Sequence, residues 1–225
     1  MLNNEKKNFI EFMMSADVLR FGEFKTKSGR LSPYFVNTGN YKTGSQIDTL
    51  GKYYAALVKD TVGDKFDAMF GPAYKGIPLA TACAGALARE YGIDKPYFFN
   101  RKEVKDHGEG GSMVGYKPQD GDNVVIVEDV VTAGTAVRES IELFKHVAKV
   151  NMKALIVSVD RMERGTRDCS TLDELREDYG IAVHPIVTVK EIISFLHNRE
   201  IDGKVYIDDE MKGRMEAYLK EYGAR

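Results

Sequence analysis

The sequence feature that most constrains the fold is an apolar run that ends in two carboxylates and a turn of small residues. Residues 123–130 (NVVIVEDV) carry Glu128 and Asp129 near the end of the run, and helix-forming residues 135–147 follow the turn. A short, continuous apolar run of this kind is typical of a strand that is buried on both faces of a mostly parallel sheet. The run therefore predicts an α/β fold in which helices flank a central sheet.

The rest of the chain repeats this alternation of short apolar runs and longer amphipathic stretches. Two extended stretches within residues 21–37 surround the turn Ser28-Gly29-Arg30 and predict a hairpin. A length of 225 residues suits a single domain, residues 1–225, with a small accessory subdomain mainly within residues 1–40 and the C-terminal region. Further strands are expected at residues 67–71, 96–100, 152–160 and 181–187, and further helices at residues 5–15, 77–90 and 208–222.

One polar stretch lies between two expected strands. Residues 102–115 (KEVKDHGEGGSMVG) contain four glycines and are expected to form a loop, which at this length in a compact domain is usually functional or disordered. Arg101, Lys102, Lys105 and His107 would make it a mobile cationic arm. The alternative interpretation is a solvated loop with incidental charge.

The charge balance argues against functions that depend on a strongly basic chain. The sequence has 32 Lys and Arg against 34 Asp and Glu, a net charge of −2, which gives no general attraction to nucleic acid or to an anionic membrane. Residues 1–9 carry charges where a signal peptide needs an apolar stretch, and the longest apolar runs are far shorter than a membrane span. Cys83 and Cys169 lie far apart without metal-ligand spacing, so we expect two free thiols in a cytoplasmic protein.

The turn after residues 123–130 has the composition of a phosphate-binding cradle. The backbone N–H groups of residues 132–135 (TAGT), at the start of a helix, can bind an anion, and the two threonines add hydroxyl donors. The carboxylates of Glu128 and Asp129 suit either sugar hydroxyls or a divalent cation held through oxygen and water. Asp129 could instead be a capping residue, and residues 132–135 an ordinary helix start, but neither interpretation explains both features. The motif G-x-x-x-x-G-K-[ST] is absent, and residues 108–113 (GEGGSM) break the pattern G-x-G-x-x-G.

A resemblance to a known family follows from five blocks of sequence. Residues 124–136 (VVIVEDVVTAGTA) resemble the phosphoribosyl pyrophosphate signature of the type I phosphoribosyltransferases. Four more blocks resemble the orotate phosphoribosyltransferase family in its own order, and the match covers most of residues 1–190. They are residues 21–39 (FGEFKTKSGRLSPYFVNTG), 70–80 (FGPAYKGIPLA), 99–111 (FNRKEVKDHGEGG) and 160–165 (DRMERG).

The resemblance implies a fold, a reaction and an assembly. The fold is that of the type I phosphoribosyltransferases, with a small N-terminal hood subdomain. The reaction is transfer of the 5-phosphoribosyl group from phosphoribosyl pyrophosphate to N1 of orotate, which gives orotidine 5′-monophosphate and pyrophosphate in pyrimidine (UMP) biosynthesis. The assembly is a homodimer in which part of the catalytic loop reaches into the site of the other subunit.

The resemblance also implies a role for each residue at a matching position. Lys27 would contact phosphoribosyl pyrophosphate, and Tyr74 and Lys75 would form the pyrophosphate-loop pair, in a turn that the family builds with a strained peptide. Phe35 and Val36 would lie beside the orotate ring, and the family often has a second phenylalanine where this chain has Val36. The catalytic residues would be Lys75, Arg101, Lys105 and His107, with Lys102 on the same loop as the last three. Orotate would be contacted by Thr132 and Arg164. The ribose and 5-phosphate would be bound by Glu128, Asp129, Val130, Val131, Thr132, Ala133, Gly134, Thr135 and Ala136.

The chemistry of the residues agrees with these roles. Phosphoribosyl pyrophosphate carries several negative charges, so its site needs cations and a phosphate cradle. Mg²⁺ with Lys and Arg can neutralise the leaving pyrophosphate, and we expect the ion near Glu128 and Asp129 through pyrophosphate, ribose hydroxyls and water rather than through a direct protein ligand. The ribose then passes through an oxocarbenium-like state, which needs no covalent nucleophile, while a closing loop excludes water. Arg164 can offer a planar fork to the carboxylate of orotate, which uracil lacks.

Two other functions are left open by the sequence. A phosphoribosyltransferase acting on a purine or another base is disfavoured by residues 21–39 and by Arg164. A non-catalytic regulator of the same fold that binds RNA or DNA should show a basic face or an added winged-helix segment and should have lost the catalytic loop, which is complete here. Elsewhere, we expect Tyr53 and Tyr54 to be core or subunit contacts, and Arg161 to be an ion-pair partner rather than a substrate ligand.

Overall fold

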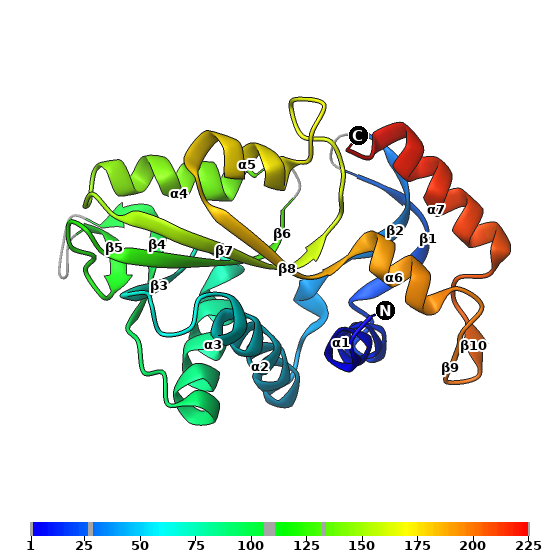
Figure 1. The fold of residues 1–225 in the computed structure, drawn as a ribbon, viewed down its shortest axis with the longest axis horizontal. Helices are drawn as coiled ribbons and strands as arrows, with labels where there is room; N and C mark the ends of the chain where they lie inside the picture. The colour runs from blue at the N-terminus through cyan, green and yellow to red at the C-terminus, as the bar shows by residue number, and fades with distance from the viewer. Residues whose placement is uncertain (1, 27–28, 106–110, 132–133, 225) are drawn as a thin grey trace.

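A six-stranded sheet in the order β5-β4-β3-β6-β7-β8 forms the centre of the molecule, and helices cover both of its faces (Figure 1). The computed structural model describes residues 2–26, 29–105, 111–131 and 134–224, without the side chains of residues 103–105 and 111. Neighbouring strands run parallel, except that β5 is antiparallel to β4. The α/β class and the mostly parallel central sheet are therefore confirmed. The strands are β3 (Ala68–Gly71), β4 (Tyr97–Lys105), β5 (Gly111–Gly115), β6 (Asn123–Val130), β7 (Asn151–Asp160) and β8 (Ala182–Thr188).

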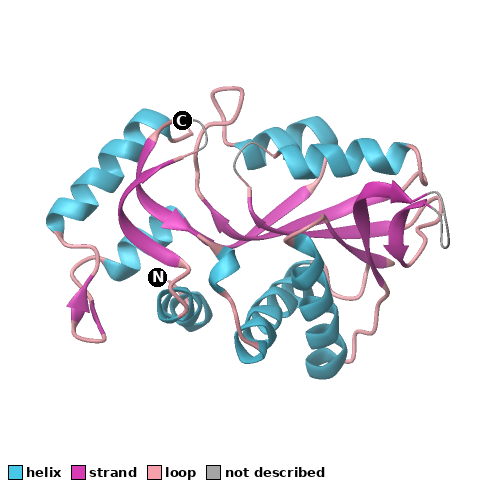
Figure 2. Ribbon diagram, turned by 180° about the vertical axis from the view of Figure 1, so that it is seen from behind, coloured by secondary structure: helices cyan, strands magenta, loops and turns pink. Residues whose placement is uncertain are grey.

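The strand β6 is apolar along most of its length because both of its faces are buried. Val125 and Val127 pack into one hydrophobic core, and Val124 and Ile126 pack into a second core on the opposite face, as the alternation of side chains along a strand requires. The first core is built with α1 (Asn4–Ser15), α2 (Gly44–Thr61), α3 (Gly76–Tyr91) and α6 (Val189–Leu196), and the second with α4 (Thr135–Lys145) and α5 (Thr171–Tyr179). Figure 2, seen from behind, shows the same two helical layers on either side of the sheet.

A second, smaller group of elements lies beyond the carboxyl end of β8, on the right of Figure 1. The expected hairpin is confirmed: β1 (Leu19–Lys25) and β2 (Leu31–Val36) pair antiparallel as a separate sheet, although Ser28 of the turn lies outside the described residues. The C-terminal helix α7 (Asp209–Tyr222) packs against β2. A short 3-10 helix η1 (Thr38–Asn40) connects β2 to α2, and β9 (Glu200–Ile201) and β10 (Lys204–Val205) form a small antiparallel pair.

The expected loop at residues 102–115 is wrong over most of its length. The strand β4 continues to Lys105, and β5 pairs with it, so that Asn100 lies opposite Met113. Met113 packs against the second core, which explains why this polar stretch forms a strand. Gly115 has a φ of +90°, and a Cβ there would lie 2.6 Å from the carbonyl oxygen of Tyr97, so this glycine serves a close strand contact rather than a flexible loop. Residues 106–110, including His107, lie outside the described residues.

The expected helices agree with α1, α3, α4 and α7 within a few residues at each end. The helices α2, α5 and α6 are absent from the sequence-based expectations. Among the described residues, no helix has both the length and the apolar character needed to cross a membrane.

Candidate active site

The carboxyl end of β6 places two acidic side chains at the centre of the sheet. Glu128 and Asp129 are 7% and 8% exposed, and α4 begins six residues after Asp129. Ligands of open α/β sheets bind outside the carboxyl ends of the strands, so this edge is where a site is expected. Two carboxyl groups this deeply buried require specific partners.

Asp129 organises the residues around it. Its Oδ2 accepts hydrogen bonds from Thr38 Oγ1 at 2.7 Å and from Lys75 Nζ at 2.9 Å, and its Oδ1 accepts the backbone N–H of Val130 at 2.6 Å. The Lys75 side chain is 59% exposed, so its ammonium contacts Asp129 on one side and is open to a ligand on the other. One carboxylate thus joins η1, the start of α3 and the end of β6.

The two adjacent carboxyl groups have opposite pKa shifts. Burial, followed by the charge of Asp129, raises the pKa of Glu128. Burial alone would also raise the pKa of Asp129, but the hydrogen bonds from Thr38 and Lys75 and the charge of Lys75 outweigh it and lower that pKa. Asp129 is therefore the ionised member of the pair, and Glu128 holds a proton into a higher pH range.

Two buried hydroxyl groups fix the backbone of this pair. Tyr54, with none of its surface exposed, donates from its OH to the carbonyl oxygen of Glu128 at 2.8 Å. Ser158 on β7 donates from its Oγ to the carbonyl oxygen of Asp129 at 2.6 Å. The expectation that Tyr54 is a core residue is confirmed, and its hydroxyl adds a direct contact with the site.

The turn between β3 and α3, residues 71–76, presents Lys75. The peptide bond between Ala73 and Tyr74 is cis, and the backbone N–H of Ala73 donates to Asn100 Oδ1 on β4 at 2.8 Å. The turn is tightly closed: a Cβ on Gly71 would lie 2.2 Å from the carbonyl oxygen of Gly76. Tyr74 is 68% exposed, so its ring is available to a ligand or a partner rather than to the core.

The start of α4 has a glycine at its N-cap. Gly134 has a φ of +70° and no side chain of its own, and no side chain in the described part of the chain caps the helix by a hydrogen bond. The first N–H groups of a helix have no partner within it and attract anions. Thr135 and Ala136 form the first turn, whereas the predicted contacts of Thr132 and Ala133 lie outside the described residues. Val131, which precedes them, is buried in the second core.

The hairpin contributes an exposed aromatic surface. Phe35 is 42% exposed and stacks on Phe24 with ring centroids 5.4 Å apart, and Val36 packs partly buried against the first core. Lys27 lies outside the described residues.

A cavity of about 400 Å³ opens between the starts of α2 and α3, and its wall includes Thr38 and Lys75. This volume is in the range of small-molecule sites.

The structure does not bring every predicted cation to Asp129. Lys102 Nζ pairs with Glu139 on α4 at 3.2 Å, and Arg101 is half-buried on β4. Lys105 ends β4, but its side chain lies outside the description, as does His107. Arg164 follows β7 and is 29% exposed on its side chain, where it donates to the main-chain oxygen of Glu221.

The expectation that Arg161 is an ion-pair partner is confirmed: its side chain is 7% exposed and pairs with Glu163 through Nε at 2.9 Å and Nη2 at 2.5 Å. Sequence reasoning missed four residues of the site, namely Thr38, Asn100, Ser158 and the hydroxyl of Tyr54. Thr38 and Asn100 lie within the matched residues 21–39 and 99–111, which was the available signal for both. Ser158 and Tyr54 reach the site through strand pairing and helix packing, which no local pattern reveals.

The chain is similar to known phosphoribosyltransferases in sequence and in fold. Residues 38–185 match the family model described as phosphoribosyl transferase domain. The chain is 54% identical over 220 residues to the orotate phosphoribosyltransferases of Clostridium acetobutylicum and Clostridium beijerinckii, covering 98% of this chain and of each relative. The crystal structure of orotate phosphoribosyltransferase from Francisella tularensis superimposes with a TM-score of 0.82 and 38% identity, covering 96% of this chain and 99% of that one.

Proposed function

The chain belongs to the orotate phosphoribosyltransferase family, and from this premise we propose how its residues transfer the 5-phosphoribosyl group of phosphoribosyl pyrophosphate to N1 of orotate. The protein is a pentosyltransferase of pyrimidine biosynthesis. The observation that carries the assignment of roles is the contact of Lys75 and Thr38 with Asp129 at the wall of the cavity. A cation, a hydroxyl donor and a carboxylate in mutual contact support the binding of a sugar phosphate there.

We assign the charged parts of phosphoribosyl pyrophosphate to three places. Lys75 and the backbone of residues 71–76 bind the pyrophosphate, with Lys27 as a further cation. The uncapped start of α4, residues 134–136, binds the 5-phosphate together with residues 130–133. Asp129 and Glu128 accept the ribose hydroxyls, and the proton that Glu128 retains lets it donate as well as accept.

Orotate is assigned to the surface formed by the hairpin and the segment after β7. Phe35 and the backbone of Val36 lie beside the ring, in line with the exposure of Phe35. Arg164 and Thr132 contact orotate, and the fork of the Arg164 guanidinium matches a carboxylate. We propose that β1, β2 and α7 together form the hood subdomain of a single domain of residues 1–225.

Mg²⁺ is part of this proposal because the residues present fit it. Among the described residues, no three His, Cys, Asp or Glu side chains gather into a site that could hold a metal ion alone. Glu128 and Asp129 offer carboxylate oxygens at one place, which suits an ion held mainly by substrate oxygens and water. When bound, the ion would neutralise negative charge on the leaving pyrophosphate.

The chain's own residues then act by position and charge. Lys75, held by Asp129, stays directed at the pyrophosphate as negative charge develops on it. The ribose is held by Glu128 and Asp129 while the bond from C1 to the leaving oxygen breaks and N1 of orotate approaches from the other face. Arg101, Lys102, Lys105 and His107 add positive charge over the pyrophosphate and exclude water.

We propose further that the protein is a homodimer and that the β4–β5 hairpin serves the other subunit's site. The strand β5 is at the edge of the sheet, and β3 and β4 lie between it and β6, so β5 is separated from Asp129 of its own chain. Lys102 pairs with an exposed carboxylate, Glu139, and exposed pairs contribute little to stability, so the Lys102 side chain can exchange this partner for another. A cytoplasmic location is also proposed, in line with Cys83 and Cys169, which are both free thiols.

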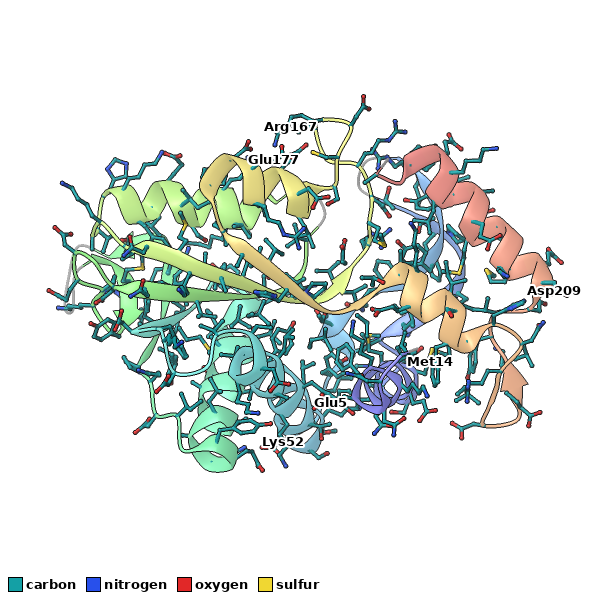
Figure 3. The ribbon with its side chains drawn as sticks, in the orientation of Figure 1. Glu5, Met14, Lys52, Arg167, Glu177 and Asp209 are labelled. Atoms are coloured by element: carbon teal, nitrogen blue, oxygen red, sulfur yellow. The ribbon has the colours of Figure 1, made fainter. Side chains whose placement is uncertain are left out.

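The first experiment is a steady-state assay with orotate, phosphoribosyl pyrophosphate and Mg²⁺ that follows the loss of orotate absorbance. We expect loss only when all three are present, and we expect Lys75→Met to lower kcat/KM about 100-fold or more. Lys52→Met is the matched control: Lys52 also pairs with an aspartate, Asp48 at 3.1 Å, and lies on the outer side of α2 away from the sheet (Figure 3). Folded protein that consumes no orotate would refute the proposal.

A subunit-mixing experiment tests the shared site. Lys105→Ala and Asp129→Asn should each be nearly inactive alone, and their mixture should regain activity because one site per mixed dimer holds no substitution. A confirmed mixed dimer without regained activity would show that the hairpin serves its own subunit.

A further inference from the structure

The segment that follows β7 is paired with the end of α7. The backbone N–H of Arg164 donates to the carbonyl oxygen of Tyr222 at 2.8 Å, and that of Ala224 donates to the carbonyl oxygen of Met162 at 2.9 Å. Glu163 and Gly223 form an antiparallel bridge between these two bonds. Figure 1 shows the end of α7 beside the loop that leaves β7. Residues 160–165, named here the β7 segment, are thus held by residues 222–224 as a strand would be.

The side chain of Arg164 is held by the same helix end. Its Nη2 donates to the main-chain oxygen of Glu221, in the last turn of α7. The last carbonyl groups of a helix have no partner within the helix and carry partial negative charge, so they attract a guanidinium. The other partner of the Arg164 guanidinium is Asp168, whose Oδ1 lies 3.8 Å from Nη1 and whose side chain is 89% exposed. Because an exposed pair of this kind contributes little, a ligand carboxylate can replace Asp168 while the neutral carbonyl oxygen of Glu221 keeps its hydrogen bond.

The carboxylate of Glu163 links α7 to the β7 segment and to the hairpin. Oε1 of Glu163 accepts hydrogen bonds from Tyr218 OH on α7 at 3.0 Å and from Tyr34 OH on β2 at 3.3 Å, in addition to those from Arg161. Oε2 of Glu163 lies 3.6 Å from Arg30 Nη1. The side chain of Glu163 is 11% exposed, so these partners, rather than water, determine its position.

The β7 segment needs this support because its backbone is unusual. Met162 has a φ of +54°, a left-handed conformation that residues other than glycine rarely adopt, and its N–H donates to Asp160 Oδ1 at 2.7 Å. On the other side, a Cβ on Gly165 would lie 2.5 Å from Glu174 Oε1 of α5, so the segment cannot relax in that direction. Arg167, labelled in Figure 3, lies in the following turn, and its backbone N–H donates to Glu174 Oε1 at 2.6 Å. The β7 segment is therefore held by the end of α7 in addition to β7, α5 and the hairpin.

We propose that residues 218–224 are a positioning element for Arg164 and that Tyr218 and Glu163 act through it to set the affinity for a ligand carboxylate. The inference rests on the proposed role of Arg164 in binding orotate. A planar guanidinium recognises a carboxylate only in a narrow range of orientations, so freedom in Arg164 weakens binding of orotate without affecting the pyrophosphate end of the other substrate.

The test compares the KM values for the two substrates. Tyr218→Phe, Glu163→Gln and a chain that ends at Glu221 should raise the KM for orotate about 10-fold, with the KM for phosphoribosyl pyrophosphate and kcat within 2-fold of wild type. Tyr116→Phe is the matched control, because Tyr116 OH also donates to a carboxylate, that of Asp122 at 3.0 Å. Asp122 directly precedes β6, so this pair lies at the end of the strand opposite to Glu128 and Asp129. Thermal unfolding identifies variants that are destabilised, and Tyr218→Phe, which keeps the ring, is the variant that should remain folded.

Arg164→Met separates the two proposals. An unchanged KM for orotate in Arg164→Met would refute the role of Arg164 and, with it, this inference. A raised KM in Arg164→Met but an unchanged KM in folded Tyr218→Phe and Glu163→Gln would refute the inference alone. Equal changes in both KM values, or a loss of kcat alone in these variants, would show a merely structural role and would also overturn it.

Discussion

Replacing Gly71 with alanine tests whether the closed turn of residues 71–76 positions Lys75. A Cβ on Gly71 would lie 2.2 Å from the carbonyl oxygen of Gly76 and 2.8 Å from Cβ of Ala80. The first atom belongs to the backbone and the second lies next to it, so neither can rotate away, and the turn itself must move. Overpacking of a tight site costs about 1–3 kcal/mol, and with a backbone atom in the way we expect about 3 kcal/mol. A displacement of Lys75 by ~1 Å should lower kcat/KM about 100-fold.

Gly85→Ala is the control on the same helix that follows the turn. The nearest atom to its new Cβ is the flexible Nη1 of Arg89 at 3.2 Å, and alanine within a helix is favoured over glycine by about 1 kcal/mol. Urea unfolding at one fixed protein concentration should therefore separate the two variants by about 4 kcal/mol, with steady-state kinetics measured on both. Equal stability of the two variants would refute the packing argument. A destabilised Gly71→Ala with wild-type kcat/KM would refute the positioning of Lys75.

Two further predictions concern the buried end of β6. Burial raises the pKa of Glu128, so above the pKa of the unfolded chain the folded protein binds more protons, and its stability falls as the pH rises through the folded pKa. Glu128→Gln should remove this loss, and chemical unfolding should show the stability of the variant relative to wild type increasing from pH 5 to pH 9. A stability difference that stays constant over this pH range would contradict the pKa shift. Tyr54→Phe should lower the free energy of unfolding by about 1–2 kcal/mol because the carbonyl oxygen of Glu128 loses a buried hydrogen-bond partner, whereas Tyr91→Phe, at an exposed ring, should leave it unchanged. Equal free energies of unfolding for the two variants would show that the Tyr54 hydrogen bond does not contribute to stability.

The parts of the site that are continuous in sequence could be predicted, and the parts that meet through space could not. Glu128 and Asp129 with the following turn lie within one motif, so composition alone indicated their chemistry. The partners that set the state of Asp129 come from elsewhere: Thr38 is 91 residues away and Lys75 is 54 residues away along the chain. The opposite pKa shifts of two adjacent carboxyl groups follow from those partners and have no counterpart in the local sequence.

The fold was predictable where periodicity was strong and was missed where other signals were needed. The helices α2 and α6 both begin with a capping box, Thr43 with Gln46 and Thr188 with Glu191, so the sequence held a start signal that hydrophobic periodicity alone does not use. Residues 102–115 show the opposite error, because four glycines indicated a loop where pairing with β4 forms a strand. Strand pairing at a sheet edge depends on the neighbouring chain segment, which overrides local composition.

Two arginines three positions apart show why burial and partners must be known before a role is assigned. Arg161 and Arg164 have the same side chain in one short motif, and either could offer a fork to a carboxylate. Arg161 is 7% exposed and is neutralised by Glu163, which is itself held by hydroxyl groups 129 and 55 residues away along the chain. If Arg161 turned to a ligand, Glu163 would lose its nearest cation and keep only Arg30 at 3.6 Å, which is destabilising for a carboxylate with so little exposure to water. Arg164 is 29% exposed and is anchored to a carbonyl oxygen, so it can bind an anion without stranding a buried charge. Tyr34 and Tyr218 hold the carboxylate that engages Arg161, and the end of α7 holds Arg164, so these elements decide which arginine can bind a ligand. Substitutions of Tyr218 and of the end of α7 are therefore expected to change the KM for orotate.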